Sequence, residues 1–146
     1  MSKKYTKKIL FIGNYLSKTR GSKGVIETII RHIDHTKFNY KLCSKYENKF
    51  FRFFDFTWFL FFSTYEKIYV DVYSGQAFLF TRLAVLASKV RRKEIIGTLH
   101  GGALKEYDQE NKSIVVKTIQ KIDRLQSPSK FLIHYFNQKK LNVNYL

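Results

Sequence analysis

One histidine of this chain stands at a position suited to catalysis. Thr98 and Leu99 end a β-prone run, and His100 follows directly, before Gly101 and Gly102. At the carboxyl end of a buried strand an imidazole faces the ligand crevice, where it can hydrogen-bond a substrate hydroxyl or stabilise developing charge. The alternative is a loop histidine that caps the next helix. We predict a catalytic role for His100, with Gly101 and Gly102 lining the same crevice.

A glycine-containing loop forms the second candidate site. It runs from Asn14 to Gly24 and precedes an apolar pattern of helical period that begins at Val25. Glycines let backbone N–H groups approach a ligand, and the start of a helix carries partial positive charge. The spacing matches neither the dinucleotide-binding nor the P-loop motif, and a plain glycine turn is the alternative. We predict phosphate or sugar-hydroxyl binding by Asn14, Gly21, Ser22, Lys23 and Gly24.

The apolar runs predict how these loops are positioned. Strands are expected at 9–12, 38–43, 68–73, 94–99, 124–127 and 141–146. Helices are expected at 25–35, 77–90, 112–122 and, with Ser129 as N-cap, up to residue 139. This alternation predicts an α/β fold with a Rossmann-like open, mostly parallel sheet and helices on both faces. Ser74 and Gly75 then share one rim of the sheet with the two loops above, and we predict that they also bind substrate.

Length and composition indicate a single folded domain over residues 1–146. Hydrophobic residues make up 45% of the chain, well above a disordered composition. The formal net charge of +16 favours an anionic partner. We expect no nucleic acid, because the basic residues are spread along the chain and no nucleic-acid-binding motif is present.

The sequence indicates a reducing compartment. Cys43 is the single cysteine, which excludes an internal disulfide. No apolar run reaches the length of a signal peptide core or a membrane span, so we expect a cytoplasmic protein. We expect no metal, because no carboxylate or cysteine completes a site with His32 and His35.

An aromatic block covers residues 50–62. Nine of its thirteen residues are Phe or Trp. The block is too short and too charged to cross a bilayer, but a helix there could insert shallowly among anionic headgroups. We predict membrane contact through Phe53, Phe56 and Trp58, on the inner face of the cell membrane. The alternative is a helix that packs in the core or against another domain.

Together these segments resemble the N-terminal domain of retaining glycosyltransferases of family GT4, which have the GT-B fold. The matching segments are 8–15 with the loop at 21–24, then 69–75, 94–102 (EIIGTLHGG) and 123–131 (DRLQSPSKF). Residues 40–66 are not covered, and Arg20-Gly21-Ser22-Lys23-Gly24 splits the glycines that are usually paired in the family.

The resemblance implies transfer of a sugar from a nucleotide donor to a saccharide acceptor with retained configuration. It implies no catalytic metal and no cofactor. His100 would contact the donor sugar, Gly21 to Gly24 would approach the donor phosphate or the acceptor, and Ser74 with Gly75 would line the acceptor side. The acceptor would be lipid-linked, as in the assembly of capsule or related surface polysaccharides.

The resemblance also implies a second lobe that binds the nucleotide. No such C-terminal donor lobe is present in these 146 residues, so we expect a partner polypeptide or a longer chain to supply it, and the 146 residues alone to be inactive. The alternative function is a non-catalytic, Rossmann-like, membrane-associated binding subunit.

Overall fold

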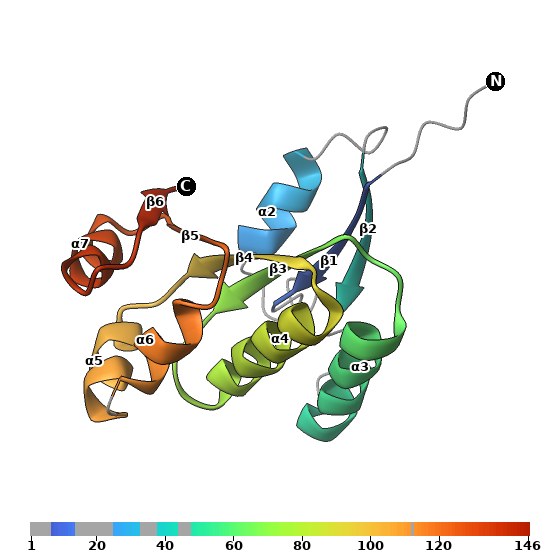
Figure 1. The fold of residues 1–146 in the computed structure, drawn as a ribbon, viewed down its shortest axis with the longest axis horizontal. Coiled ribbons are helices and arrows are strands. Elements are labelled where there is room, and N and C mark those ends of the chain that lie inside the picture. The colour runs from blue at the N-terminus through green and yellow to red at the C-terminus, as the bar shows by residue number, and fades with distance from the viewer. Residues whose placement is uncertain (1–6, 14–24, 33–37, 44–47, 112) are drawn as a thin grey trace.

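The computed structural model describes residues 7–13, 25–32, 38–43, 48–111 and 113–146. Its strands are β1 (Lys7–Ile12), β2 (Phe38–Cys43), β3 (Lys67–Val72), β4 (Glu94–Leu99), β5 (Arg124–Ser127) and β6 (Val143–Tyr145). They form one sheet in the order β2-β1-β3-β4-β5-β6, and every neighbouring pair is parallel (Figure 1). The predicted α/β fold with an open sheet is confirmed, and the described strands are all parallel rather than mostly so.

The strand order reverses between β1 and β3. The chain leaves β1 through α2 (Val25–His32) to reach β2, and returns through α3 (Lys49–Phe62) to β3 on the other side of β1. Because parallel crossovers are right-handed, the two helices must lie on opposite faces of the sheet. Figure 1 shows α2 on one side and α3 and α4 on the other. Ligand crevices of open α/β sheets form at such a reversal.

The remaining helices follow the strands in turn. They are η1 (Gly75–Ala77), α4 (Phe78–Arg91), α5 (Ala103–Glu110), α6 (Ile114–Ile119) and α7 (Lys130–Gln138). Ser129 caps α7 as expected, since its Oγ accepts a hydrogen bond from the N–H of Leu132 at 3.4 Å. The α5 helix was not predicted, because its sequence ALKEYDQE has too few apolar residues to show a helical period.

The apolar core lies in two layers of unequal size. The larger layer joins one face of the sheet to helices α3 to α7, with fully buried Leu10, Ile68, Ile95 and Leu99 at its centre. The smaller layer lies on the opposite face, where Ile30 of α2 packs with residues of β1 and β3. The two apolar layers hold the sheet between them and so fix the edge where the strands end.

The aromatic helix α3 has a core side and an exposed side. Phe56 and Leu60 are buried, and the Phe56 ring lies 4.5 Å from the Phe80 ring of α4. The prediction that Phe56 contacts a membrane is therefore wrong, because the helical period turns it toward the sheet. Phe53 is partly buried and Trp58 is exposed. The exposed side forms an aromatic stripe of Phe50, Phe51, Phe54, Trp58 and Phe62, each 56 to 69% exposed.

A buried carboxylate joins the three C-terminal helices. The Asp108 side chain on α5 is fully buried and accepts hydrogen bonds from Tyr135 and Lys139 of α7, at 3.0 and 2.5 Å. It also accepts from the N–H of Val116 in α6 at 3.3 Å. The hydrogen bond from Lys139 to Asp108 is the main reason that the pKa of Lys139 is raised. A buried charge satisfied in this way fixes α5, α6 and α7 relative to one another.

We expect Asp108→Ala to lower the free energy of unfolding by about 2–4 kcal/mol, because it leaves three donors without their acceptor. Urea denaturation followed by circular dichroism measures the change. Glu106→Ala, which removes an exposed acid from the same helix, is the control and should change stability by less than about 0.5 kcal/mol. Equal stability of the two variants would contradict the role assigned to Asp108.

Candidate functional site

Two of the three predicted loops meet at the carboxyl edge of the sheet. Val72 and Leu99 end the paired strands β3 and β4, and the N–H of His100 donates to the carbonyl of Val72 at 3.0 Å. The chain turns through Gly75 with φ +67° and Gly101 with φ +81°, conformations that favour glycine. These loops therefore lie side by side as expected. Asn14, Gly21, Ser22, Lys23 and Gly24 lie outside the described residues.

His100 is held by a buried carboxylate. Asp71 pairs with Thr98 across the sheet, and His100 lies two residues beyond Thr98, so both side chains point to the same face. The His100 Nε2 lies 2.9 Å from Asp71 Oδ1, with the two side chains 8% and 1% exposed. This contact fixes the orientation of the imidazole ring at the strand end.

Tyr73 completes a three-residue cluster. Its ring stacks on His100 with centroids 5.2 Å apart and planes 22° apart. Burial, and secondarily the nearby Asp71 charge, raises the pKa of Tyr73 to about 12. The phenol therefore keeps its proton at neutral pH and remains a hydrogen-bond donor beside the imidazole.

The electrostatics of the cluster depend on Asp71. Burial raises the pKa of Asp71 above its ordinary value of 3.8, and the hydrogen bond and charge of His100 offset part of that rise. Because the folded-state pKa is raised, the contribution of this group to stability is fully present below about pH 3.8 and is lost as the pH rises through the raised pKa. Ionisation of Asp71 therefore lowers the stability of the fold. Buried groups with perturbed pKa values of this kind are typical of functional sites.

A second hydrogen-bonded cluster supports the same face of the sheet. The Thr98 hydroxyl donates to the Tyr69 oxygen at 2.7 Å, and the Gln126 amide donates to the same oxygen and to Thr98. Burial is the main cause of a raised pKa of Tyr69. These bonds tie β3, β4 and β5 together next to Asp71 and His100, and so hold the two strand ends in register.

A small cavity lies at the strand-order reversal. Gly13 at the end of β1, Asp71 and Tyr73 of the β3 end, and Arg52 of α3 are among its lining residues. Its volume is about 40 Å³, which admits a water molecule but not a sugar. A saccharide would therefore lie outside this cavity, above the strand ends.

A larger cleft opens beside the same edge. It has a volume of about 690 Å³ and extends from Gly75 and Gln76 between α3, α4, α5 and α6. Arg52, Arg82 and Tyr107 supply polar groups along an otherwise largely apolar wall. This size falls within the range of small-molecule sites, so the cleft can accommodate a substrate with both polar and apolar parts.

Three residues of the candidate site were not predicted from the sequence: Asp71, Tyr73 and Arg52. Asp71 did carry a signal, since it is the one charged residue inside the apolar run 68–73, and it lies on the same face as Tyr73 by the period of a strand. Arg52 carried no such signal in the sequence, because only the packing of α3 against the sheet brings it to the reversal.

Among the described residues, no group of three or more His, Cys, Asp or Glu side chains could hold a metal ion. Within those same residues no helix is both long and apolar enough to cross a membrane. No protein-family model, curated protein or solved structure matches this chain.

We expect His100→Ala to raise the pKa of Asp71 further, because both contributions of His100 lower it. Carbon-13 NMR of the side-chain carboxyls during a pH titration measures this pKa directly. The control is His134→Ala, which removes an exposed histidine of α7 and should leave the pKa of Asp71 unchanged. An unchanged or lower pKa of Asp71 in His100→Ala would show that the pair is not electrostatically coupled.

Proposed function

We propose that this domain is the acceptor-side lobe of a retaining glycosyltransferase, which transfers a sugar from a nucleotide-sugar donor to a saccharide acceptor. The observation that carries the proposal is the cluster of Asp71, Tyr73 and His100 at the carboxyl ends of β3 and β4, next to the strand-order reversal between β1 and β3. An imidazole fixed by a buried carboxylate, at the edge where open α/β sheets bind ligands, suits contact with sugar hydroxyls.

Each member of the cluster has a distinct part in this proposal. Asp71, when ionised, accepts a hydrogen bond from Nε2–H of His100, which selects one tautomer of the neutral ring. The other ring nitrogen, Nδ1, is then an acceptor for a hydroxyl of the reacting sugar. The Tyr73 phenol adds a neutral donor. His100 thus positions the hydroxyl and stabilises charge that develops during transfer.

The adjoining cleft suits the acceptor. Ser74 and Gly75 lie at the edge, and the cleft beyond Gly75 combines arginines with apolar side chains. A saccharide attached to a lipid through a phosphate has parts that complement these groups: a phosphate for the arginines, hydroxyls for the polar side chains and a lipid for the apolar wall. This chemistry supports a lipid-linked acceptor of the kind used in surface-polysaccharide assembly. The proposal places the protein on the cytoplasmic side of the membrane.

The donor nucleotide would be bound by a second lobe, on a continuation of the chain or on a partner subunit. In this proposal no cofactor takes part, and no metal ion either. The loop of Gly21 to Gly24 remains the candidate for the donor phosphate. A second lobe with two glutamates one or two helical turns apart, encoded downstream or in a partner, would support the proposal.

A non-catalytic binding subunit is the second candidate function. It is favoured by the burial of the Asp71–His100 pair, whose contact with each other is compatible with a purely structural role. The two functions differ in what the loss of His100 does to turnover.

We expect His100→Ala to reduce sugar transfer by on the order of 100-fold, because a positioned histidine contributes about that much. The assay combines this chain with the donor lobe and follows a labelled sugar from its nucleotide into extracted lipid-linked acceptor. Thermal unfolding of the variant checks that the fold is retained.

His134→Ala serves as the matched control and should keep full activity, because the His134 ring lies on the exposed side of α7. Full transfer activity in a folded His100→Ala protein would refute the role of His100. Loss of stability with unchanged turnover per folded molecule would favour the binding-subunit function.

A further inference from the structure

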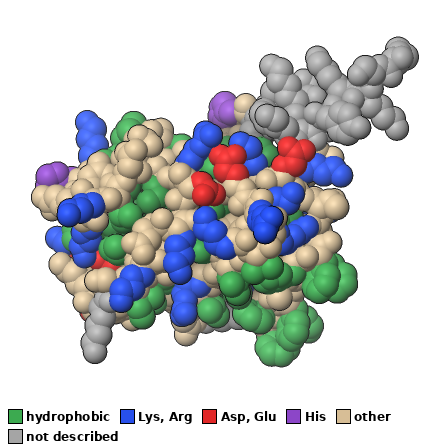
Figure 2. Space-filling model, in the orientation of Figure 1, with side chains coloured by type: hydrophobic (Ala, Val, Ile, Leu, Met, Phe, Trp, Pro, Cys, Tyr) green, Lys and Arg blue, Asp and Glu red, His purple; other side chains and the backbone are tan. Residues whose placement is uncertain are grey.

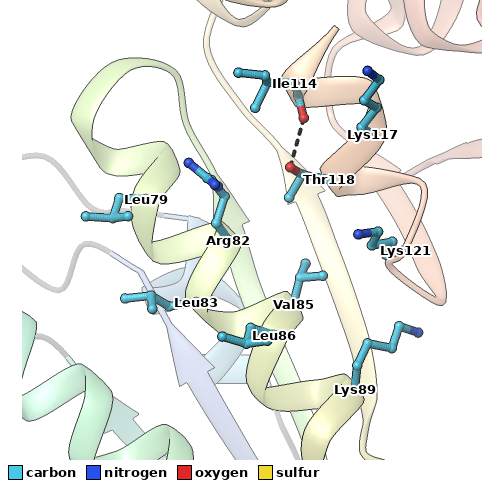
Figure 3. A pocket seen from close by; sticks show the side chains of 10 residues that line it. All are labelled: Leu79, Arg82, Leu83, Val85, Leu86, Lys89, Ile114, Lys117, Thr118 and Lys121. Atoms are coloured by element: carbon cyan, nitrogen blue, oxygen red, sulfur yellow. Dashed lines mark hydrogen bonds between the residues drawn. The ribbon is translucent and has the colours of Figure 1, made fainter.

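A basic groove runs between α4 and α6, on the face opposite to α2. Its volume is about 590 Å³, and its walls carry Arg82 and Lys89 from α4 and Lys117 and Lys121 from α6 and the turn after it. Figure 3 shows these side chains around the groove. Four cations along one apolar groove form an environment that attracts anions.

The charge of this groove is largely uncompensated. Neither α4 nor α6 contains an acidic residue. Lys89 forms an ion pair with Asp123 at 3.3 Å, whereas Arg82, Lys117 and Lys121 make no ion pair with an acidic side chain in the described ranges. These three cations are exposed and available to an external anion.

The rim and floor of the groove are aliphatic. Leu79, Leu86 and Ile114 line it and are 42 to 54% exposed, and Leu83 lies between them on α4. Cations set beside exposed leucine and isoleucine match the headgroup and upper acyl region of a phospholipid, where a phosphate lies above apolar chains. A soluble anion would need no aliphatic rim.

The aromatic stripe of α3 extends this surface. The α3 and α4 helices pack side by side, and Arg91 of α4 donates to the carbonyls of Leu60 and Ser63 at 2.9 and 2.7 Å. Figure 2 shows hydrophobic side chains gathered over the region of α3, with lysines and arginines beside them. Within the stripe the Trp58 and Phe62 rings contact each other, with centroids 4.7 Å apart and planes tilted by 31°. Aromatic residues of this kind favour the membrane interface.

We propose that the surface of α3, α4 and α6 docks on an anionic phospholipid membrane, with lipid phosphates in the basic groove and the aromatic stripe among the headgroups. Charge complementarity with the formal net charge of +16 supports this occupant. The aliphatic rim of the groove favours lipid over nucleic acid, because the phosphates, sugars and base edges of a nucleic acid are bound mainly by polar side chains and make little use of exposed leucines.

The docking also orients the candidate active site. The basic groove and the cleft beside Gly75 share Leu79, Arg82 and Ile114, so the cleft adjoins the proposed membrane face. A lipid-linked acceptor held in this cleft would then lie next to the bilayer. The docking itself rests on the surface alone and would hold equally for the binding subunit.

Vesicle co-sedimentation of the full 146-residue chain tests the proposal. We expect binding to phosphatidylcholine vesicles that contain phosphatidylglycerol, weak binding to phosphatidylcholine alone, and weaker binding as salt is added. Arg82→Gln with Lys117→Gln and Lys121→Gln should weaken binding by about fivefold per charge, on the order of 100-fold in total. Phe54→Ser with Trp58→Ser should weaken it at least about tenfold.

Matched controls remove the same groups elsewhere. Arg31→Gln with Lys130→Gln and Lys140→Gln removes three exposed cations outside this surface, and Phe131→Ser with Tyr145→Ser removes two exposed rings. Each control variant should bind the phosphatidylglycerol vesicles more tightly than the matching variant of the docking surface.

Five outcomes would overturn the proposal. They are equal binding by the groove variant and its charge control, equal binding to vesicles with and without phosphatidylglycerol, and displacement from the vesicles by inorganic phosphate at low concentration. The fourth is self-association of the chain that is lost in Phe54→Ser with Trp58→Ser, since the stripe would then face a second copy. Preferential binding of single-stranded DNA would likewise contradict it.

Discussion

The pairing of β3 with β4 is the interaction on which the candidate active site depends. It places Asp71 opposite Thr98 and Val72 opposite Leu99, so that His100 emerges two residues beyond the partner of Asp71. A shift of one residue would turn His100 to the opposite face and leave a buried carboxylate without its partner. The hydrogen bonds among Tyr69, Thr98 and Gln126 act against such a shift, because they require the same register across three strands.

The two faces of the sheet have different parts in the molecule. The face with the larger apolar layer supports α3 to α7, and through α3, α4 and α6 it carries the basic groove and the aromatic stripe. The other face carries the polar side chains of the candidate site, Asp71 and His100. Because successive residues of a strand alternate between faces, one short sequence serves both purposes: in β3, Ile68 and Val70 build the core while Asp71 builds the site.

The proposed docking surface and the proposed site have opposite electrostatic characters. At the strand ends burial raises the pKa of Asp71, and this carboxyl group orients the His100 imidazole. On α4 and α6 the cations are exposed, and their attraction for a membrane would be screened by salt. The groove and the cleft nevertheless meet at Leu79 and Arg82, which would let one lipid-linked molecule contact both.

Much of the fold was determined by the sequence itself. The apolar runs, their helical or continuous spacing, and the Ser129 cap placed most strands and helices, and the alternation of the two predicted the parallel sheet. Local pattern also placed His100 and Gly75 at strand ends, because a glycine or histidine after an apolar run marks where a strand stops. The polar helix α5 escaped prediction because it shows no apolar period.

Only the tertiary structure decided which residues act together. His100 follows Asp71 and Tyr73 by more than 25 residues in the chain and meets them through the pairing of β3 with β4. Arg52 reaches the reversal through packing of α3. The same packing decided that Phe56 faces the core and that Phe54 and Trp58 face outward, since a helix rich in phenylalanine on every side does not reveal its buried side by composition. The groove between α4 and α6 arises from two segments that carry no common motif. Its cations form one surface only because both helices cover the same face of the sheet.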